Sequence, residues 1–423
     1  MMIIIRKRWL SATIIPIVLF YLFEFRFFYL IPLPTVLVAG TTNKNLLAVF
    51  ALMAFTYFLL RTKKISFGYY GYTFILIFIA IAASTALSSL EFGYKTTQIL
   101  WGIIPYLILL LYFPGRKYLA DEDIREQFIV IGELCSIFIA IIFLAQYFVY
   151  KNQHTLFLNL PNMIPDHYIW HPNEGLRIRN TFDGFFRIFA LIVADRIFAK
   201  KFRKCGLDFF SFLSITLVIL MIDRSRSYLV IVMLSAISML IYRAKRKTTK
   251  AIFLIGSCTL IAGVTVISNK LSSIFSSITD NSGSWFARVE GVVHFTKIGL
   301  EHFFLGIGMA DPEAIASAER YVRGPEGIFY PDDVGIVGVF ALTGVIGLVL
   351  YLVFIAKVFK SFRYADRNKA LIFGMFVCLI LSSVLSSYFD RSRITALVLT
   401  AVFCEISISK RPKVHELDYI DRL

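Results

Sequence analysis

The sequence predicts an all-α, polytopic integral membrane protein with about 12 transmembrane helices, forming a single membrane domain over residues 1–423. Hydrophobic residues make up 58% of the chain and its mean hydropathy is +0.72, whereas soluble domains are about 45–50% apolar. Apolar runs close to the ~20 residues that cross a bilayer core recur along most of the chain. We place the spans at residues 10–27, 46–60, 69–89, 98–113, 128–149, 183–199, 207–222, 228–243, 251–268, 334–356, 370–388 and 394–409.

The basic residues predict how these spans are oriented. Of the 44 Lys and Arg residues, 27 lie in alternate polar gaps and in the two tails, and 15 lie in the opposite gaps and their edges. The positive-inside rule makes the basic-rich gaps cytoplasmic, so we expect both termini in the cytoplasm. The net charge of +16 therefore reflects topology and contact with membrane lipids. Without a soluble basic face, the pattern does not favour nucleic acid as a partner.

The outer gaps differ in character from the inner ones. Only two are long enough to form loops of their own, at residues 150–183 and 269–333. Ten of the 15 outer basic residues are arginine, and five of the six histidines are also outside. We therefore expect any chemistry on the outer side, in these two loops and in the short arginine-bearing gaps.

Cysteines and histidines predict neither a disulfide framework nor a metal site. The five cysteines lie in spans or on the inner side, where no set of outer disulfides is implied. His167 and His171 are four residues apart, but Pro165 and Pro172 bracket them, which argues against a helix that presents both on one face. No metal and no cofactor is predicted.

The tetrapeptide Asp-Arg-Ser-Arg occurs twice, at residues 223–226 and 390–393, each time in a short outer gap. A guanidinium presents a fixed fork of donors that fits phosphate with two hydrogen bonds. Alternatively, each Asp pairs with a neighbouring Arg and anchors a helix end among lipid headgroups. Two matching motifs on one side, with further arginines in both long loops, favour an anion site that suits a lipid-linked phosphate or diphosphate.

The apolar spacing of residues 285–304 predicts a helix within the second long loop. One stripe of this helix consists of Arg288, Val292, Phe295 and Gly299, with Arg288 as its single charge. A buried arginine is costly without a partner, so we expect it to meet an acidic side chain or a substrate anion. Gly299 allows something to approach the backbone closely. A second stripe, about 160° away, carries Glu290, His294, Lys297 and Glu301.

Several stretches in order resemble the O-antigen polymerase and O-antigen ligase superfamily. FFLGIGMADPEA (303–314) is followed by YPDDVGIVGVFALTGVIGLVLYLVF (330–354), which is similar to the family's glycine turn and its next helix. RIRNTFDGFFRIFALIVA (177–194) and DRSRSYLVIVMLS (223–235) resemble its upstream motifs. The spacing from Arg288 to Gly299 also fits the family pattern. The resemblance covers roughly residues 175–355.

This resemblance implies a GT-C-type architecture with a large helical periplasmic loop, in the bacterial inner membrane. It implies a metal-independent enzyme that takes undecaprenyl-diphosphate-linked sugars as donors at the periplasmic face. Arg224 matches the family's helix-start arginine and Arg288 its large-loop arginine, so both are expected to be catalytic. The residues expected to bind substrate are Arg226, Arg177, Arg179, Arg391, Arg393, Gly299 and His294.

The sequence departs from the family pattern where its ligases carry a histidine, just before the last family helix. Here that place reads YPDDVG, with Asp332 and Asp333. An aspartate can accept a proton as a general base, so both are candidate catalytic residues. The alternative is a turn that starts a helix, since Pro and Asp favour that position.

Three functions remain open from the sequence. The first is a polymerase of polysaccharide repeat units, with a chain-length regulator and a flippase as possible partners. The second is a ligase that transfers finished glycan to lipid A-core or another acceptor. The third is a transporter or flippase for a lipid-linked glycan, which should carry charges along its mid-membrane spans. The chain has few such charges.

Overall fold

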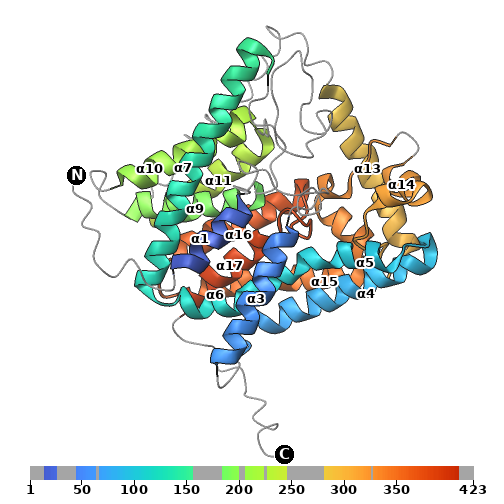
Figure 1. Cartoon of the computed structure of the whole chain (residues 1–423), viewed down its shortest axis with the longest axis horizontal. Helices are drawn as coiled ribbons and strands as arrows, with labels where there is room; N and C mark the ends of the chain where they lie inside the picture. The colour runs from blue at the N-terminus through green and yellow to red at the C-terminus, as the bar shows by residue number, and fades with distance from the viewer. Residues whose placement is uncertain are drawn as a thin grey trace, which may run out of the picture.

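The computed structural model describes residues 14–25, 44–62, 66–155, 183–199, 205–222, 226–244, 281–324 and 327–408, and every regular element in these ranges is helical (Figure 1). Apart from the 3-10 helices η3, η7 and η8 and the π-helical turn η5, these elements are α-helices. In chain order they are α1 (Ile14–Glu24), α3 (Asn45–Arg61), α4 (Gly71–Phe92), α5 (Thr96–Ile103), η3 (Ile104–Leu111), α6 (Tyr112–Tyr118), α7 (Glu122–Gln153), α9 (Asp183–Ala199), α10 (Gly206–Leu217), η5 (Val218–Ile222), α11 (Arg226–Arg243), α13 (Asn281–Glu301), η7 (Pro312–Ala314), α14 (Ala316–Arg323), η8 (Pro331–Asp333), α15 (Gly335–Tyr364), α16 (Lys369–Leu385) and α17 (Ile394–Ser407).

These helices follow the predicted spans closely. The span predicted at 183–199 coincides with α9, and the helix predicted at 285–304 is α13. Four helical stretches in the described residues have the length and composition of membrane spans, and six shorter apolar helices accompany them. The structure confirms a helical membrane protein, whereas the span at 251–268 lies outside the described residues. The four long stretches are Gly71–Phe92, Thr96–Tyr118, Glu122–Gln153 and Gly335–Tyr364.

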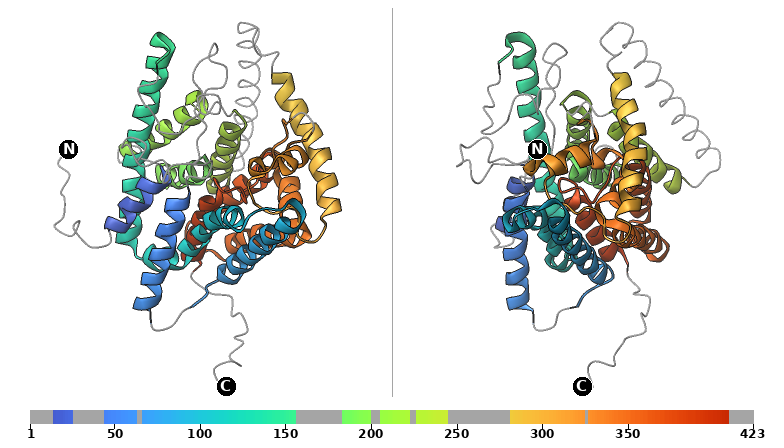
Figure 2. Two further views of the ribbon diagram at one scale, coloured as in Figure 1. Left: turned by 45° about the vertical axis from the view of Figure 1, so that its right-hand side comes forward. Right: turned by 90° about the vertical axis from the view of Figure 1, so that its right-hand side faces the viewer.

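Helix α9 lies at the centre of the helical bundle. Residues 184–195 are all buried, and the helix contacts α10, α11, α16 and α17 (Figures 1 and 2). A helix that is covered on all sides can be apolar all round, and the sequence from Phe185 to Ala194 is apolar apart from one arginine, Arg187. That arginine becomes the centre of the site described below.

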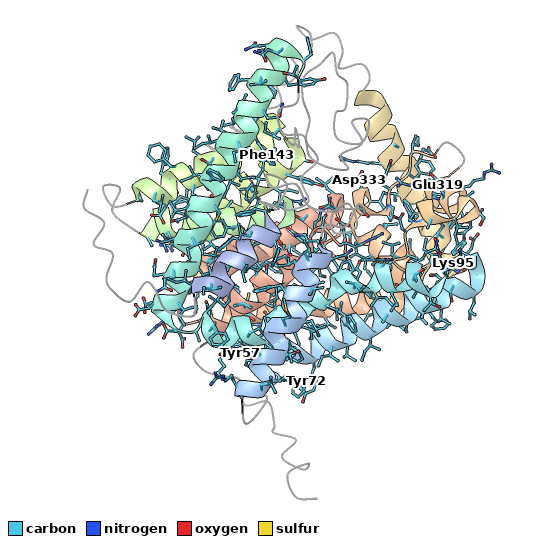
Figure 3. All side chains as sticks on the ribbon, in the orientation of Figure 1. Tyr57, Tyr72, Lys95, Phe143, Glu319 and Asp333 are labelled. Atoms are coloured by element: carbon cyan, nitrogen blue, oxygen red, sulfur yellow. The ribbon has the colours of Figure 1, made fainter. Side chains whose placement is uncertain are left out.

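The two ends of the bundle separate the predicted inner and outer gaps. Figure 3 shows Tyr57 and Tyr72 at one end, and Lys95, Glu319 and Asp333 toward the other. The C-termini of α4 and α16 and the N-termini of α5, α15 and α17 lie at the outer end. Helices α13 and α14 cover part of this end and supply much of the loop predicted at 269–333, whereas most of the loop predicted at 150–183 falls outside the described residues.

Helix α15 is interrupted at Gly344, where a turn from another part of the chain inserts its backbone. Gly344 has φ +62° and ψ −167°, which breaks the helical ladder. Phe303 and Phe304, just after α13, accept hydrogen bonds from Val345 N (2.7 Å) and Ile346 N (3.3 Å). On the other side of the break, the turn donates from Ile307 N and Gly308 N to carbonyls of α15 at 3.0 and 2.8 Å. Irregular backbone inside a membrane protein needs such internal partners.

Candidate active site at the outer end of the helices

The second Asp-Arg-Ser-Arg segment is fixed in place by its last residue. Arg393 is buried (5% exposed) and forms an ion pair with Asp390 at 3.7 Å. Its guanidinium also donates to the Tyr228 hydroxyl at 2.9 Å and to the carbonyls of Asp332 and Ser387, both at 3.3 Å. Arg393 therefore joins three segments that are far apart in the sequence. Its predicted contact with substrate stays a prediction.

A second buried arginine, which the sequence analysis did not select, completes this arrangement. Arg187 of α9 has 0% exposure. It donates to the hydroxyls of Ser386 at 3.0 Å and Ser382 at 3.4 Å, both on or next to the end of α16. Its guanidinium carbon lies 3.4 Å from the centroid of the Tyr228 ring. The signal that could have revealed it is a charge inside a predicted membrane span, since such charges are rare and usually functional or paired.

Tyr228, near the start of α11, contacts the second Asp-Arg-Ser-Arg segment and Arg187. It stands two positions after the last residue of the first segment, in the sequence DRSRSY. Its hydroxyl accepts a hydrogen bond from Arg393, and its ring contacts Arg187. The start of α11 is thereby held beside residues 390–393. Arg226 is the first residue of α11, but its side chain, like the whole of Arg224, lies outside the described residues.

Arg391 occupies a different environment from Arg393. It is only half-buried, and its charge acts on Tyr94, between α4 and α5. Burial raises the pKa of Tyr94 to about 12, with a further increase from the charge of Asp311 and an opposing effect of Arg391. The charges of Arg391 and Asp332 also both act on Tyr106 of η3. Arg391 thus lies among polar groups from three separate loops.

The two candidate aspartates form the turn η8 ahead of α15. Asp333 N donates to Tyr330 O at 3.1 Å and closes the turn. The turn begins at Pro331 and leads directly into α15, as the alternative of a turn that starts a helix predicts, although no side chain in the described residues caps α15. The half-buried carboxylate of Asp333 has no hydrogen-bonded or ionic partner within the described structure. Asp332, through its carbonyl, is held by Arg393.

Arg288 lies on the inward-facing side of α13, as its stripe predicts. It is half-buried, and its Nε is buried without a hydrogen-bond partner among the described residues. Phe295, two turns further on, is fully buried. The prediction is wrong for Val292, whose side chain is 40% exposed. Arg288 therefore borders the exposed side of the helix.

Gly299 and His294 lie in the packing of α13 against its neighbours. A Cβ on Gly299 would approach the Phe340 ring of α15 to 2.4 Å, so the close approach that the glycine permits is made by an aromatic ring of the protein. His294 donates from Nε2 to Tyr321 O at 3.0 Å, and its ring lies 5.0 Å from that of Phe329. Both residues support the position of α13, and their predicted substrate contacts stay predictions.

Two predicted substrate-binding arginines and the absence of a metal site remain to be compared with the structure. Arg177 and Arg179 lie outside the described residues. In the part of the chain that the structure describes, no three His, Cys, Asp or Glu residues are grouped so that they could hold a metal ion.

A comparison with known protein families gives a match, and it covers the region that carries most of this site. Residues 210–352 match the family model described as O-antigen ligase, a family of glycosyltransferase-like enzymes of surface polysaccharide assembly. No curated protein matches the sequence. The matched region runs from α10 into α15 and includes Arg224, Arg288, Asp332 and Asp333. The match supports, over residues 210–352, the resemblance to the O-antigen polymerase and ligase superfamily that the sequence motifs indicate.

Proposed function

We propose that the protein is a polymerase that joins undecaprenyl-diphosphate-linked oligosaccharide repeat units into O-antigen or a related surface polysaccharide. The observation that carries the proposal is the carboxylate of Asp333. It lies inside the region that matches the family, at the outer end of the helices, and it has no partner within the described structure. Two half-buried arginines, Arg288 and Arg391, belong to the same end of the molecule.

The reaction moves a glycan from a lipid diphosphate to a sugar hydroxyl. The acceptor oxygen forms a bond to the anomeric carbon of the donor, and the bond from that carbon to the diphosphate oxygen breaks. The electron pair of that bond leaves with the diphosphate, while the hydroxyl proton passes to a base or to water. Negative charge therefore develops on the leaving group, where preorganised donors stabilise the transition state most.

The residues divide into two roles in this proposal. Arg288 and Arg224 contact the diphosphate with the planar fork that suits phosphate oxygens, with Arg226 and Arg391 supporting them. Asp333, with Asp332 as the alternative, accepts a hydrogen bond from the acceptor hydroxyl and orients its oxygen toward the anomeric carbon.

The proposed setting is a twelve-span protein of GT-C type in the bacterial inner membrane. Both termini are cytoplasmic and the outer end faces the periplasm, in accordance with the distribution of basic residues. A chain-length regulator and a flippase that delivers the lipid-linked units are the proposed partners.

A ligase is the second candidate, because the family model that matches is described as O-antigen ligase. The aspartates in place of the family's ligase histidine favour the polymerase. A transporter is less well supported. Glu133, which lies inside the span of α7, is 3.6 Å from Arg196 of α9, and Arg196 is also 2.6 Å from Glu126, so these charges serve each other rather than a translocated anion.

The test is elongation by the purified protein in nanodiscs, supplied with one undecaprenyl-diphosphate-linked repeat unit. A polymerase produces a ladder of longer lipid-linked glycans from this substrate alone. A ladder-free product that requires lipid A-core would identify a ligase, and movement of an unchanged substrate across a vesicle membrane would identify a transporter.

Two variants test the assigned residues in the same assay. Asp333→Asn should lower turnover by at least about a hundredfold, the low end for a positioned acid or base. Arg288→Lys keeps the charge and loses the fork, so most activity should be lost. Normal elongation by Asp333→Asn and by Asp332→Asn would exclude both aspartates from the reaction. Glu319→Gln on exposed α14 is the matched control for loss of an outer carboxylate.

A further inference from the structure

Helix α13 presents an apolar face that no other described part of the protein covers. Along it, Val289, Val292, Val293 and Leu300 are 45%, 40%, 64% and 62% exposed. Phe304, in the turn that follows, is 69% exposed. At 3.6 residues per turn these positions fall on one side of the helix. A stripe of this kind is exceptional on a water-facing surface.

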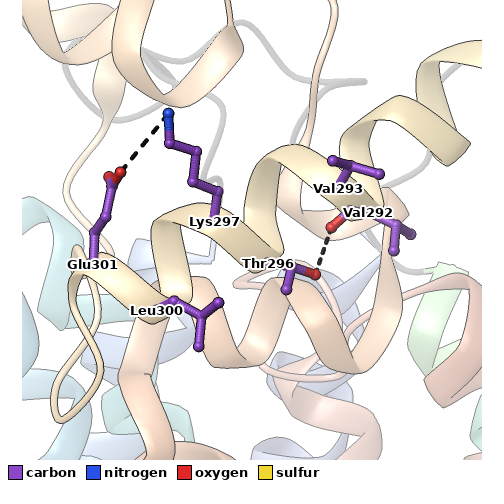
Figure 4. A pocket seen from close by; sticks show the side chains of 6 residues that line it. All are labelled: Val292, Val293, Thr296, Lys297, Leu300 and Glu301. Carbon is purple, nitrogen blue, oxygen red and sulfur yellow. Dashed lines mark hydrogen bonds and ion pairs between the residues drawn. The ribbon is translucent and has the colours of Figure 1, made fainter.

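Thr296 belongs to the same face, although it is polar. Its hydroxyl donates to the carbonyl of Val292, one turn back, at 2.7 Å. The hydroxyl is therefore satisfied within the helix and needs no water. Figure 4 shows this bond beside the open groove of about 530 Å³ that the exposed face forms with its polar neighbours. The groove is lined by Val292, Val293, Thr296, Lys297, Leu300 and Glu301.

The remainder of α13 divides into two further sectors. The inward sector, with Gly291, Phe295, Ile298 and Gly299, is buried. The third sector is polar and lies about 100° around the helix from the exposed apolar face. In it, the ammonium of Lys297 lies 3.9 Å from Glu301, whose carboxylate also accepts the Tyr321 hydroxyl at 2.6 Å. The sector as a whole consists of Glu290, His294, Lys297 and Glu301. A helix with one side in protein, one apolar and one polar is suited to the boundary between a bilayer and water.

The exposed apolar face continues onto a membrane-spanning helix. Phe304 accepts a hydrogen bond from Ile346 N of α15, and the Ile346 side chain is 42% exposed. Further along α15, Val349, Leu352 and Val353 are exposed by 50%, 46% and 40%. These residues belong to one of the four long apolar helices, so they face lipid. The exposed face of α13 extends this lipid-facing surface toward the outer end.

We propose that α13 lies at the outer surface of the membrane with its exposed apolar face among the acyl chains of the outer leaflet. Its polar sector then faces water, and Lys297 reaches the headgroup region by snorkelling. Within the large outer loop, α13 is thus a membrane-surface element rather than part of a free periplasmic loop.

The orientation has a consequence for Arg288, and this step rests on the proposed function. Arg288 lies between the buried sector and the exposed apolar face, next to Val292 at 3.6 residues per turn. Its guanidinium is therefore placed at the edge of the lipid-facing surface, where the diphosphate of a membrane-held substrate travels. Substrate would reach Arg288 by moving sideways along α13 within the leaflet.

Spin labels test the orientation without any substrate, so the result does not depend on the proposed function. The native cysteines of the full chain are first replaced, and one cysteine is then introduced at a time, in place of Val293 or Leu300. Each introduced cysteine carries a nitroxide label, and the protein is placed in phospholipid nanodiscs. At each label we compare the rate of collision with oxygen, which concentrates in lipid, with the rate of collision with a water-soluble nickel chelate. The ratio of the first rate to the second should be severalfold higher at these two labels than at a label on Lys297. Val349 of α15 is the lipid control and Glu319 of α14 the water control.

Two outcomes would overturn the proposal. If the labels at Val293 and Leu300 match Glu319, α13 faces water. If both reagents are excluded from them, the face is covered by protein, such as a second copy of the chain. A label that disturbs folding is detected by comparing the size-exclusion profile of the labelled protein with that of the Lys297 variant. In that case Leu300→Trp, a smaller change to the side chain, reports contact with lipid through quenching of its fluorescence by brominated lipid.

Discussion

The guanidinium of Arg187 lies against the ring of Tyr228, 3.4 Å from guanidinium carbon to ring centroid, and the hydroxyl of that tyrosine accepts from Arg393. The two contacts link the start of α11 to residues 390–393 through Tyr228, which stands two positions after Arg226 in the sequence. A desolvated cation–π pair contributes about 2 kcal/mol or more.

Two substitutions at Tyr228 separate its ring from its hydroxyl. Tyr228→Phe removes the acceptor for Arg393 and should lower the free energy of unfolding by about 1.5–3 kcal/mol, the range for hydrogen bonds to charged groups. Tyr228→Leu also removes the ring from Arg187 and should cost more. Thermal unfolding in detergent measures both. Equal stability of the two variants would show that the ring contact contributes nothing.

The two arginines of residues 390–393 should behave differently. Arg393→Ala removes a buried group that joins three segments, so it should lower the melting temperature clearly. Arg391→Ala affects a half-buried side chain, and should lower kcat/KM for elongation while leaving the melting temperature nearly unchanged. Melting curves and elongation rates of the two purified variants make the comparison. The reverse pattern would exchange their structural and substrate-binding roles.

Gly344 should tolerate no side chain. A Cβ there would lie 2.3 Å from the Phe304 carbonyl, at a φ of +62° that L-residues rarely adopt. Gly344→Ala should therefore prevent insertion of the turn and reduce the yield of folded protein. Gly206→Ala is the matched control, because a Cβ at Gly206 meets nothing within 4 Å. Fluorescence-detected size-exclusion profiles compare the two, and a normal profile for Gly344→Ala would contradict the expectation.

Tyr94 should make the protein sensitive to alkali. Burial raises the pKa of Tyr94 to about 12, whereas an unfolded tyrosine ionises near ~10. The stabilisation is fully present below pH ~10 and is lost as the pH rises through 12. Tyr94→Phe cannot ionise, so its melting temperature should improve relative to wild type between these values. Melting curves that stay parallel from pH 8 to 12 would refute this.

The sequence predicts those features that depend on local composition. The boundaries of α9 are predicted correctly because the run from Phe185 to Ala194 is apolar apart from Arg187, and charged residues flank this run. The face of α13 that carries Arg288 and Phe295 is predicted from helical spacing alone. The prediction that Val292 faces inward is wrong, because an apolar residue on the exposed side of a helix cannot be told by composition from one that faces a protein core.

The contacts that build the site depend on distant residues, and no local pattern encodes them. Arg187 and Ser386 are 199 positions apart, so the fact that this charge has hydroxyl partners follows only from the fold. The PDD turn shows the same limit. Its sequence suits both a turn that starts a helix and a catalytic carboxylate, and only the three-dimensional arrangement shows that Asp333 has no partner among the described residues.

The interruption of α15 at Gly344 makes the outer region and the membrane helices one cooperative folding unit. Four backbone hydrogen bonds cross from the turn after α13 into the break, and they replace bonds that α15 cannot make for itself. Removing the turn would leave these groups unpaired inside an apolar environment, at a cost of several kcal/mol for each group. A truncation that excises α13 and its turn should therefore unfold α15, and native-state hydrogen exchange should report a single opening event for both segments. The turn after α13 lies outside α15 in the sequence, yet it supplies the backbone hydrogen-bond partners without which α15 is not stable.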